Sequence, residues 1–266
     1  MSLLIKQGMI VDPSQKLHSI SDLWIKEGKI FKISKKIDAV ADTVIDARGC
    51  IVAPGFIDMH THLREPGGEH KETIATGAKA AAAGGFTSVV CMANTEPVND
   101  NPFITQFIRL RAEREAVVNV FPVGALSKGL EGKALSEIGA LHDAGCVAIS
   151  DDGRPVMNSR LMRKALEYCK AFGLTVISHA EDLNLVGDGT MNEGIQSTVL
   201  GLRGIPAQAE EILVARDIAL SELTQSPVHF AHISTRAAVR LIEDAKRRSI
   251  PITAEVGGGG GGGGGG

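Results

Sequence analysis

The chain has 266 residues and a formal net charge of -3, and it carries no basic patch of the kind that nucleic-acid binding requires. No apolar run approaches the roughly 20 residues that span a bilayer, which argues against a membrane protein. The four cysteines are widely spaced and lie in or beside apolar segments, which predicts reduced core thiols in a soluble, cytoplasmic protein.

The last ten residues, 257–266, are all glycine. Such a run has no side chain to bury and does not specify a packed element. We interpret it as an artefact or a stand-in for unidentified residues rather than as a natural linker. Residues 1–256 are numerous enough for one barrel-sized domain and a small additional one.

Residues 1–53 contain short alternating segments separated by turn residues, which predicts a small β-domain. Glu27 and Gly28 separate two of these segments and are typical of a hairpin turn. The expected strands cover 3–5, 9–11, 22–26, 29–33, 44–46 and 51–53.

Residues 54–256 alternate between short apolar runs and helical segments. The runs are apolar throughout, as expected for parallel strands covered on both faces. Six strand–helix units and a seventh strand predict a (β/α)8 barrel that is incomplete at its C-terminal end, with a doubly wound sheet as the alternative. The expected strands cover 55–60, 87–92, 117–123, 147–150, 174–178, 228–231 and 252–255, and the expected helices 71–83, 102–115, 135–144, 159–172, 207–223 and 235–248.

Polar residues cluster just past the C-terminal ends of these strands. In a barrel those ends converge on one face, where active sites are built, so residues far apart in sequence are expected to meet in one pocket. The residues concerned are His60, His62, Asn94, Asp151, Asp152, His179, Glu181 and His232.

His60 and His62 are two residues apart on a strand, so both side chains point to the same side and two imidazoles can bind one ion. The alternative is a pair of exposed or hydrogen-bonded histidines. His179 and His232 each follow an apolar strand, where a lone histidine is more often a satisfied core residue. Their shared position with the first pair favours metal ligands, whereas His229 lies early in its strand and is interpreted as structural.

Asp151, Asp152 and Gly153 form either a turn or a charged site at the end of the fourth barrel strand. Two carboxylates at this rim would be costly to desolvate unless a cation neutralised them. Four histidines and one carboxylate suit zinc, with one or two ions. Asp58, one layer deeper than His60, has either a structural role or that of orienting a ligand histidine.

Arg64 lies just beyond the histidine pair, where a guanidinium can hold a substrate carboxylate through two hydrogen bonds. Asn94 can add a further hydrogen bond to the same substrate. The alternatives are a surface salt bridge for Arg64 and a helix N-cap for Asn94.

Residues 55–67 read GFIDMHTHLREPG, which resembles the signature of the dihydroorotases, in the cyclic amidohydrolase superfamily. The resemblance extends over residues 1–256 and is closest to the longer-chain, class I dihydroorotases. It continues through MANT at 92–95, SDDG at 150–153, HAED at 179–182, GLRGIP at 201–206 and AHIST at 231–235.

The resemblance implies a zinc-dependent, reversible cyclisation of N-carbamoyl-L-aspartate to L-dihydroorotate in pyrimidine biosynthesis. It implies that Arg64 and Asn94 bind the substrate carboxylate, that residues 1–53 belong to a composite β-sandwich, and that the catalytic acid–base aspartate lies beyond Val256. It also implies a homodimer and association with aspartate transcarbamoylase. The implied zinc ligands are His60, His62, Asp152, His179 and His232.

Two other functions remain open at this point. The first is another cyclic amidase, either a hydantoinase (dihydropyrimidinase) or an allantoinase. Many of these relatives have a carboxylated lysine at the fourth strand end, where this sequence has no lysine. The second is a non-catalytic, dihydroorotase-like subunit that supports a partner enzyme, which would be marked by the loss of metal ligands.

A protein that ends at Val256 is expected to be insoluble or inactive, because it would lack the eighth barrel strand and the acid–base aspartate. Expression of residues 1–256 and an assay of dihydroorotate turnover test this expectation. Measurable turnover by the purified fragment would contradict it.

Overall fold

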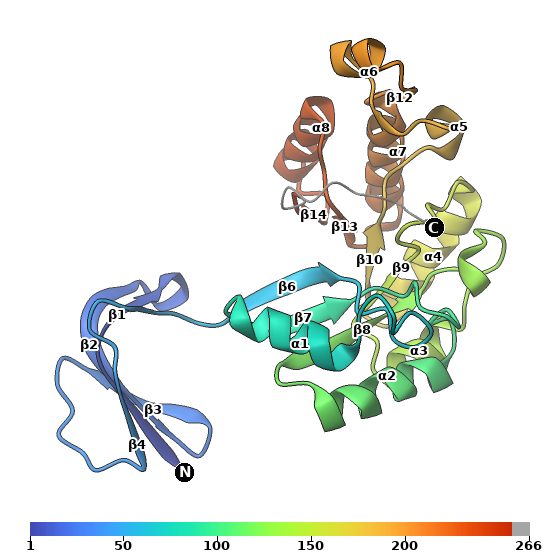
Figure 1. The fold of residues 1–266 in the computed structure, drawn as a ribbon. Helices are drawn as coiled ribbons and strands as arrows, with labels where there is room; N and C mark the ends of the chain where they lie inside the picture. The colour runs from blue at the N-terminus through green and yellow to red at the C-terminus, as the bar shows by residue number, and fades with distance from the viewer. Residues whose placement is uncertain (257–266) are drawn as a thin grey trace. The chain divides into compact units, whose positions relative to one another are not determined.

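The computed structural model describes residues 1–256, and the glycine run at 257–266, interpreted above as an artefact or unidentified residues, lies outside the described residues. The chain divides into two compact units, Met1–Phe56 and a second that begins at Ile57. Each unit is built on its own main sheet (Figure 1).

The first unit is a five-stranded sheet in the order β3-β2-β1-β4, with β5 beside β1. β1 pairs antiparallel with β2 and parallel with β4 and β5. The strands are β1 (Ser2–Asp12), β2 (Leu17–Lys26), β3 (Lys29–Ser34), β4 (Thr43–Asp46) and β5 (Ile51–Val52), with a 3-10 turn at Pro13–Gln15.

The strands expected at 3–5 and 9–11 are one strand, β1, whose pairing shifts between Ile5 and Gly8. Such a bulge changes the register of a strand without ending it, so the polar break in the pattern is not a turn. The expected hairpin is present, because Glu27 and Gly28 have φ values of 51° and 73°, as a two-residue type I′ turn requires.

The second unit contains a seven-stranded sheet in the order β6-β7-β8-β9-β10-β13-β14. Its strands are β6 (Phe56–Thr61), β7 (Phe86–Cys91), β8 (Asn119–Ala125), β9 (Ala148–Ser150), β10 (Thr175–Ser178), β13 (Val228–Phe230) and β14 (Ile252–Ala254). Its long connecting helices are α1 (Ile74–Ala83), α2 (Pro102–Glu115), α3 (Ile138–Ala144), α4 (Ser159–Ala171), α7 (Gln208–Thr224) and α8 (Arg236–Arg247), with a 3-10 turn at Lys128–Leu130.

The order of the strands decides between the two predicted architectures. The strands follow one another across the sheet in chain order, and the pairs from β7 to β14 are parallel. A doubly wound sheet would reverse its strand order at a switch point, and this sheet does not. The unit is therefore an incomplete (β/α)8 barrel, as predicted.

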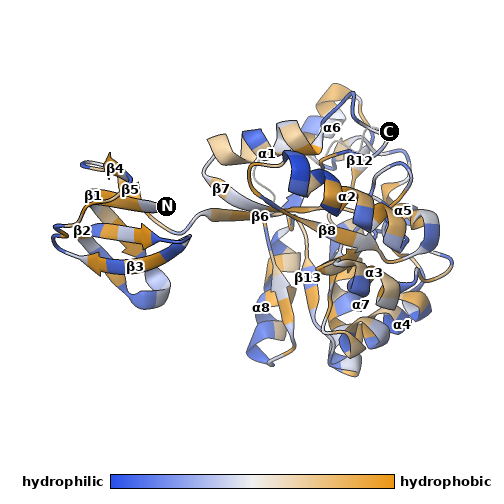
Figure 2. Ribbon diagram, turned by 90° about the horizontal axis from the view of Figure 1, so that it is seen from below, coloured by the Kyte–Doolittle hydropathy of each residue, from blue (hydrophilic) through white to orange (hydrophobic). Residues whose placement is uncertain are grey.

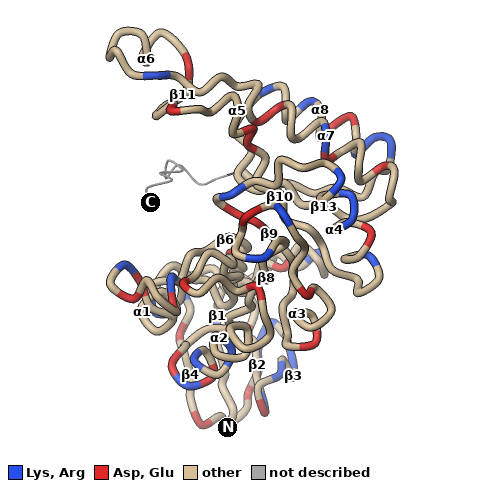
Figure 3. Tube along the Cα trace, turned by 90° about the vertical axis from the view of Figure 1, so that its right-hand side faces the viewer, with Lys and Arg blue, Asp and Glu red and all other residues tan. Residues whose placement is uncertain are grey.

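Different hydrophobic clusters cover the two faces of the barrel sheet at β10 and β13. Val176 and Phe230 pack with the helices in the larger cluster, whereas Ile177 and Ala231 pack in a smaller one. Successive strand residues point to opposite faces, so the smaller cluster lines the other face of the sheet. Figure 2 shows the apolar character of the strands. Of the residues in these seven strands, Asp58 is the only Asp, Glu, Lys or Arg, the residue types that Figure 3 colours.

One excursion between β10 and α7 was not predicted. It consists of α5 (Leu183–Val186), β11 (Met191–Asn192), α6 (Ile195–Leu200) and β12 (Gly204–Ile205), with β11 and β12 paired in a separate two-stranded sheet. These elements have two to six residues each, too few for a hydrophobic period to show in the sequence. Among the described residues, no helix combines the length and the apolarity that crossing a membrane requires.

Phe230 tests the helix-facing core. Its side chain is fully buried, so Phe230→Ala is expected to lower the free energy of unfolding by about 3–5 kcal/mol. Phe103 on α2 is 77% exposed, and Phe103→Ala is the matched control, with an expected change within about 0.5 kcal/mol. Urea unfolding followed by circular dichroism measures both, and equal losses would contradict the assigned core.

Candidate metal centre

Asp152 lies at the centre of a cluster of four histidines at the strand ends. Its carboxylate is almost fully buried, at 4% exposed. Oδ1 lies 3.3 Å from His60 Nε2, 3.2 Å from His179 Nδ1 and 3.5 Å from His232 Nε2. Oδ2 lies 3.5 Å from His62 Nε2. The five residues predicted as metal ligands therefore meet at one point, although they come from four different strand ends.

Strand register explains this convergence. Ser178 at the end of β10 aligns with Phe230 of β13, which aligns with Ala254 of β14. The residues that follow these aligned ends therefore come out at one level on the same edge of the sheet. His232 has a φ of 41°, in the left-handed region that non-glycine residues rarely adopt. Its Nε2 approaches His179 Nδ1 to 2.8 Å.

Three of the histidines also contact an acceptor through the ring nitrogen that faces away from Asp152. His60 Nδ1 lies 3.2 Å from Glu255 Oε1, and His62 Nδ1 lies 3.0 Å from Asn94 Oδ1. His179 Nε2 lies 3.4 Å from a carboxylate oxygen of Glu181. Metal-binding histidines commonly donate their second N–H to such a partner, which sets the tautomer and the ring orientation.

The cluster is strongly polarised by these contacts. Burial opposes the charge on His60, but hydrogen bonds to Asp152 and Glu255 outweigh it and raise its pKa to about 9. His179 behaves alike: burial opposes its charge, and hydrogen bonds to Asp152 and Glu181 raise its pKa to about 9. Burial disfavours the charge on Asp152, yet the surrounding histidines hold its pKa well below the usual range. The Asp152 carboxylate is therefore held in its charged form, and positive charge is favoured on the His60 and His179 rings beside it.

The donor set fits a metal ion. One ligand atom each from His60, Asp152 and His232 lies within 4.8 Å of the other two, close enough to hold one ion. His62 and His179 extend the same cluster through their contacts with Asp152. Imidazole nitrogens combined with a carboxylate are typical zinc ligands in enzymes.

Asp151 does not join the cluster, so its carboxylate is not a second charge at the site. Its Oδ1 accepts hydrogen bonds from the backbone N–H groups of Leu126 and Ser127, at 2.7 and 2.9 Å, and Oδ2 accepts one from the Ser127 hydroxyl. Burial outweighs these bonds and raises the pKa of Asp151 to about 6. The two adjacent aspartates therefore divide their roles, one facing the histidines and the other holding the loop after β8.

Arg64 and Asn94 lie next to the histidines. The positive charge of Arg64 contributes to lowering the pKa of His62, although burial of His62 contributes most. Within residues 1–256, the Arg64 guanidinium has no ion pair or hydrogen bond, so the predicted alternative of a surface salt bridge does not hold. The alternative for Asn94 is also wrong, because Asn101 caps α2.

Among residues 1–256, Glu255 is the residue in contact with the histidine cluster that the sequence did not single out. It directly follows β14, the same strand-end position that marked the other site residues, and this was the signal available. Its Oε2 lies 3.7 Å from His229 Nε2, while His229 Nδ1 contacts Thr253 Oγ1 at 2.8 Å. Hydrogen bonds with His229 and His60 lower the pKa of Glu255 to about 2. Asp58 accepts from the backbone N–H of His60, not from its ring.

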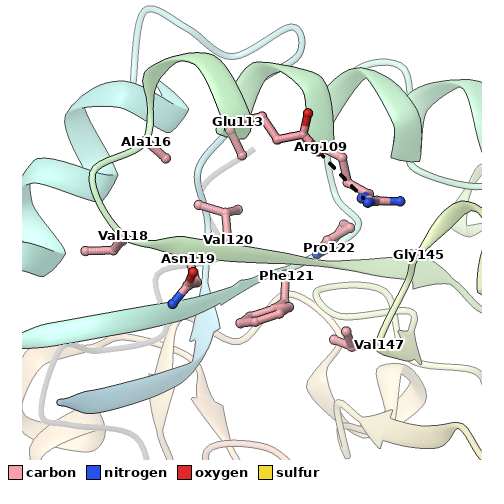
Figure 4. A pocket seen from close by; sticks show the side chains of 11 residues that line it. Arg109, Glu113, Ala116, Val118, Asn119, Val120, Phe121, Pro122, Gly145 and Val147 are labelled. Carbon is pink, nitrogen blue, oxygen red and sulfur yellow. Dashed lines mark ion pairs between the residues drawn. The ribbon is translucent and has the colours of Figure 1, made fainter. Parts of the chain in front are cut away.

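A hollow of about 530 Å³ lies away from this centre, between α2 and the N-terminal half of β8 (Figure 4). Its walls are mainly apolar, with the Arg109–Glu113 ion pair on one side. It contains none of the predicted site residues and lies toward the strand starts, whereas barrel active sites are built at the strand ends. The hollow is therefore not assigned to the site.

A family model described as dihydro-orotase-like matches residues 49–238, more than half of the chain. The chain belongs to this family. It is 57% identical over 256 residues to a dihydroorotase of Geotalea daltonii and 56% identical to one of Geobacter sulfurreducens. In each case the match covers 96% of this chain and 60% of the relative, so the chain spans about 60% of the length of these curated relatives.

Solved structures agree with the barrel fold. The L-hydantoinase (dihydropyrimidinase) of Arthrobacter aurescens superposes with a TM-score of 0.81 at 21% identity, over 96% of this chain and 58% of that one. The D-hydantoinase (dihydropyrimidinase) of a Thermus species superposes with a TM-score of 0.73 at 27% identity, over 96% of this chain and 57% of that one. These likenesses support an amidohydrolase barrel.

Asp152→Asn is expected to weaken metal binding strongly, because it removes the charge that all four histidines surround. Loss of an outer partner of a ligand typically costs about 10–100-fold in metal affinity, so loss of this carboxylate should cost at least that much. Zinc per chain after gel filtration measures the effect. Asp143→Asn, at an exposed position beside His142, is the control. Zinc retained equally by both variants would remove Asp152 from the centre.

Proposed function

We propose that the full-length protein is a zinc-dependent dihydroorotase, which interconverts N-carbamoyl-L-aspartate and L-dihydroorotate. The observation that carries this proposal is the Arg64 guanidinium, which has no ion pair within residues 1–256, beside a cluster of four histidines and a buried carboxylate. The identity to proteins named dihydroorotase supports it. A ring substrate that bears a carboxylate would use both groups, because its carboxylate would bind Arg64 and its ring amide would lie at the metal centre.

Zinc, as one or two ions, would be held by His60, His62, Asp152, His179 and His232. When bound, it supplies Lewis-acid polarisation of the ring amide carbonyl and lowers the pKa of a bound water to about 7. Asp152 contacts histidines through both of its oxygens, so either oxygen would be available to a bound ion. Glu255, Asn94 and Glu181 orient three of the rings through their outward nitrogens.

Arg64 would bind the free carboxylate of the substrate through two charge-assisted hydrogen bonds. Asn94 contacts His62 through Oδ1, which leaves its amide N–H groups to donate to the same carboxylate. In hydrolysis, water adds to the amide carbonyl, the ring C–N bond breaks, and the leaving nitrogen takes a proton. The group expected to transfer this proton is an aspartate beyond Val256.

The alternatives lack a specific observation in their favour. A hydantoinase or allantoinase acts on a neutral ring, which would leave Arg64 without a carboxylate to bind. At the end of β9, where many such relatives have a carboxylated lysine, the cluster here uses Asp152. A non-catalytic subunit would be expected to have lost ligands, whereas all five are present and convergent.

The cellular setting and assembly belong to the same proposal. Cys91, Cys146 and Cys169 are buried free thiols, which suits a reducing cytoplasm, whereas Cys50 is exposed and the predicted core position is wrong for it. A homodimer and an association with aspartate transcarbamoylase are proposed from the family resemblance. Residues 1–53 would form part of a composite β-sandwich.

Arg64→Ala in the full-length protein tests the substrate. Loss of the charged contact should lower kcat/KM for dihydroorotate by roughly 10–100-fold, since hydrogen bonding to a charged group contributes about 1.5–3 kcal/mol in total and about 1.36 kcal/mol corresponds to tenfold. Activity on hydantoin, which lacks the carboxylate, should not fall. Arg163→Ala is the control, because Arg163 lies on the exposed face of α4 and pairs with Glu167.

Steady-state kinetics with both substrates and zinc analysis of each variant provide the measurements. A parent protein that hydrolyses hydantoin as well as dihydroorotate would overturn the assignment. Freshly purified full-length protein without bound zinc would favour the non-catalytic subunit.

A further inference from the structure

We infer that Glu65 and Arg111 form a clamp that positions Arg64 for the substrate carboxylate. This inference rests on the proposed function, because it assigns a role in the same site. Glu65 directly follows Arg64 in the chain, and Arg111 lies on α2, 46 residues away. Within residues 1–256, neither side chain has an ion pair or hydrogen bond with the histidine cluster, so both would act through Arg64.

The backbone at Arg64 needs support from its surroundings. Its φ is 59°, in the left-handed region, which costs a non-glycine residue conformational energy unless neighbouring contacts hold it. The Arg64 carbonyl accepts a hydrogen bond from Gly68 N–H at 2.7 Å, and Glu65 N–H donates to the Leu63 carbonyl at 2.8 Å. These bonds close a tight loop but do not attach it to the barrel.

The Glu65 side chain makes that attachment. It is 3% exposed, and its Oε2 accepts a hydrogen bond at 2.9 Å from the backbone N–H of Ile74, the first residue of α1. Its Oε1 accepts a hydrogen bond at 2.7 Å from Nε of Arg111. A buried carboxylate is tolerated only when it is paired and hydrogen-bonded, and here both oxygens are satisfied by two different helices. The loop is thereby tied to α1 and α2 together.

The same loop is packed against the segment that carries Asn94. Glu96 N–H donates to the Pro66 carbonyl at 2.9 Å. Gly67 has a φ of 92°, and a Cβ there would lie only 2.0 Å from the Glu96 carbonyl oxygen, so the two backbones are in close contact. The clamp on Glu65 therefore also sets the distance between the two predicted carboxylate contacts, Arg64 and Asn94.

A purely structural anchor for α1 and α2 is the competing explanation, and kinetics separate the two. Glu65→Gln in the full-length protein keeps an acceptor for Ile74 N–H but removes the charge that holds Arg111. If the pair positions Arg64, KM for dihydroorotate should rise about tenfold while kcat stays within about twofold and zinc content is unchanged. Arg111→Met removes the other partner of the pair and should give the same rise in KM. Arg111→Lys keeps the charge and should restore KM in part.

Glu115→Gln is the matched control. Glu115 also pairs with Arg111, with its Oε1 2.6 Å from Nη1, and lies one helical turn further along α2. Its side chain is more exposed than that of Glu65. Its loss should change KM by less than about twofold, as is usual for a surface pair. A tenfold effect from Glu115→Gln would show that Arg111, and not its pairing with Glu65, is the sensitive element, and would overturn the inference.

The decisive measurement is a double-mutant cycle with Arg64→Ala. When Arg64 is absent, Glu65→Gln should have no further effect on kcat/KM, because the clamp acts only through that side chain. Independent, multiplicative losses would overturn the inference while leaving the proposed function intact, as would an unchanged KM in both Glu65→Gln and Arg111→Met. A parent protein without dihydroorotate turnover would instead overturn the proposed function, and the inference with it.

Discussion

One buried negative charge organises the site. Asp152 is removed from water, and a carboxylate in that position is stable only if positive charge or strong donors surround it. Four imidazoles from three other strand ends provide that surrounding, within 3.2–3.5 Å. Because each of them depends on the same carboxylate, the position of one strand end constrains all the others.

The barrel supplies the geometry that this charge requires. Its strands lie in chain order and in parallel register, so consecutive strand–helix units place their next residues at one edge. Two outward ring nitrogens then reach acceptors on other strand ends, as His60 does with Glu255 and His62 with Asn94. The histidine rings are therefore fixed by two sets of contacts, with Asp152 at the centre of the cluster and with these acceptors around it.

Sequence predicted the parts of this arrangement that depend on local pattern. The seven barrel strands and six long helices follow from hydrophobic runs, and the convergence of His60, His62, Asp152, His179 and His232 follows from their shared strand-end position. Pattern alone did not predict which neighbour each carboxylate faces. Asp151 and Asp152 are adjacent and identical, yet one binds backbone N–H groups and the other faces histidines. That choice depends on the loop after β8, which is distant in sequence.

Carboxylates that avoid the cluster have a common use. Asp151 accepts N–H groups of the loop after β8, Glu65 accepts the first N–H of α1, and Glu210 accepts the N–H groups of Ser234 and Thr235. Each thus satisfies backbone donors that a loop or a helix start would otherwise leave unpaired. These three carboxylates are occupied by backbone donors and, for Glu65, by Arg111, so that within residues 1–256 Asp152 is the one carboxylate that all four histidines share.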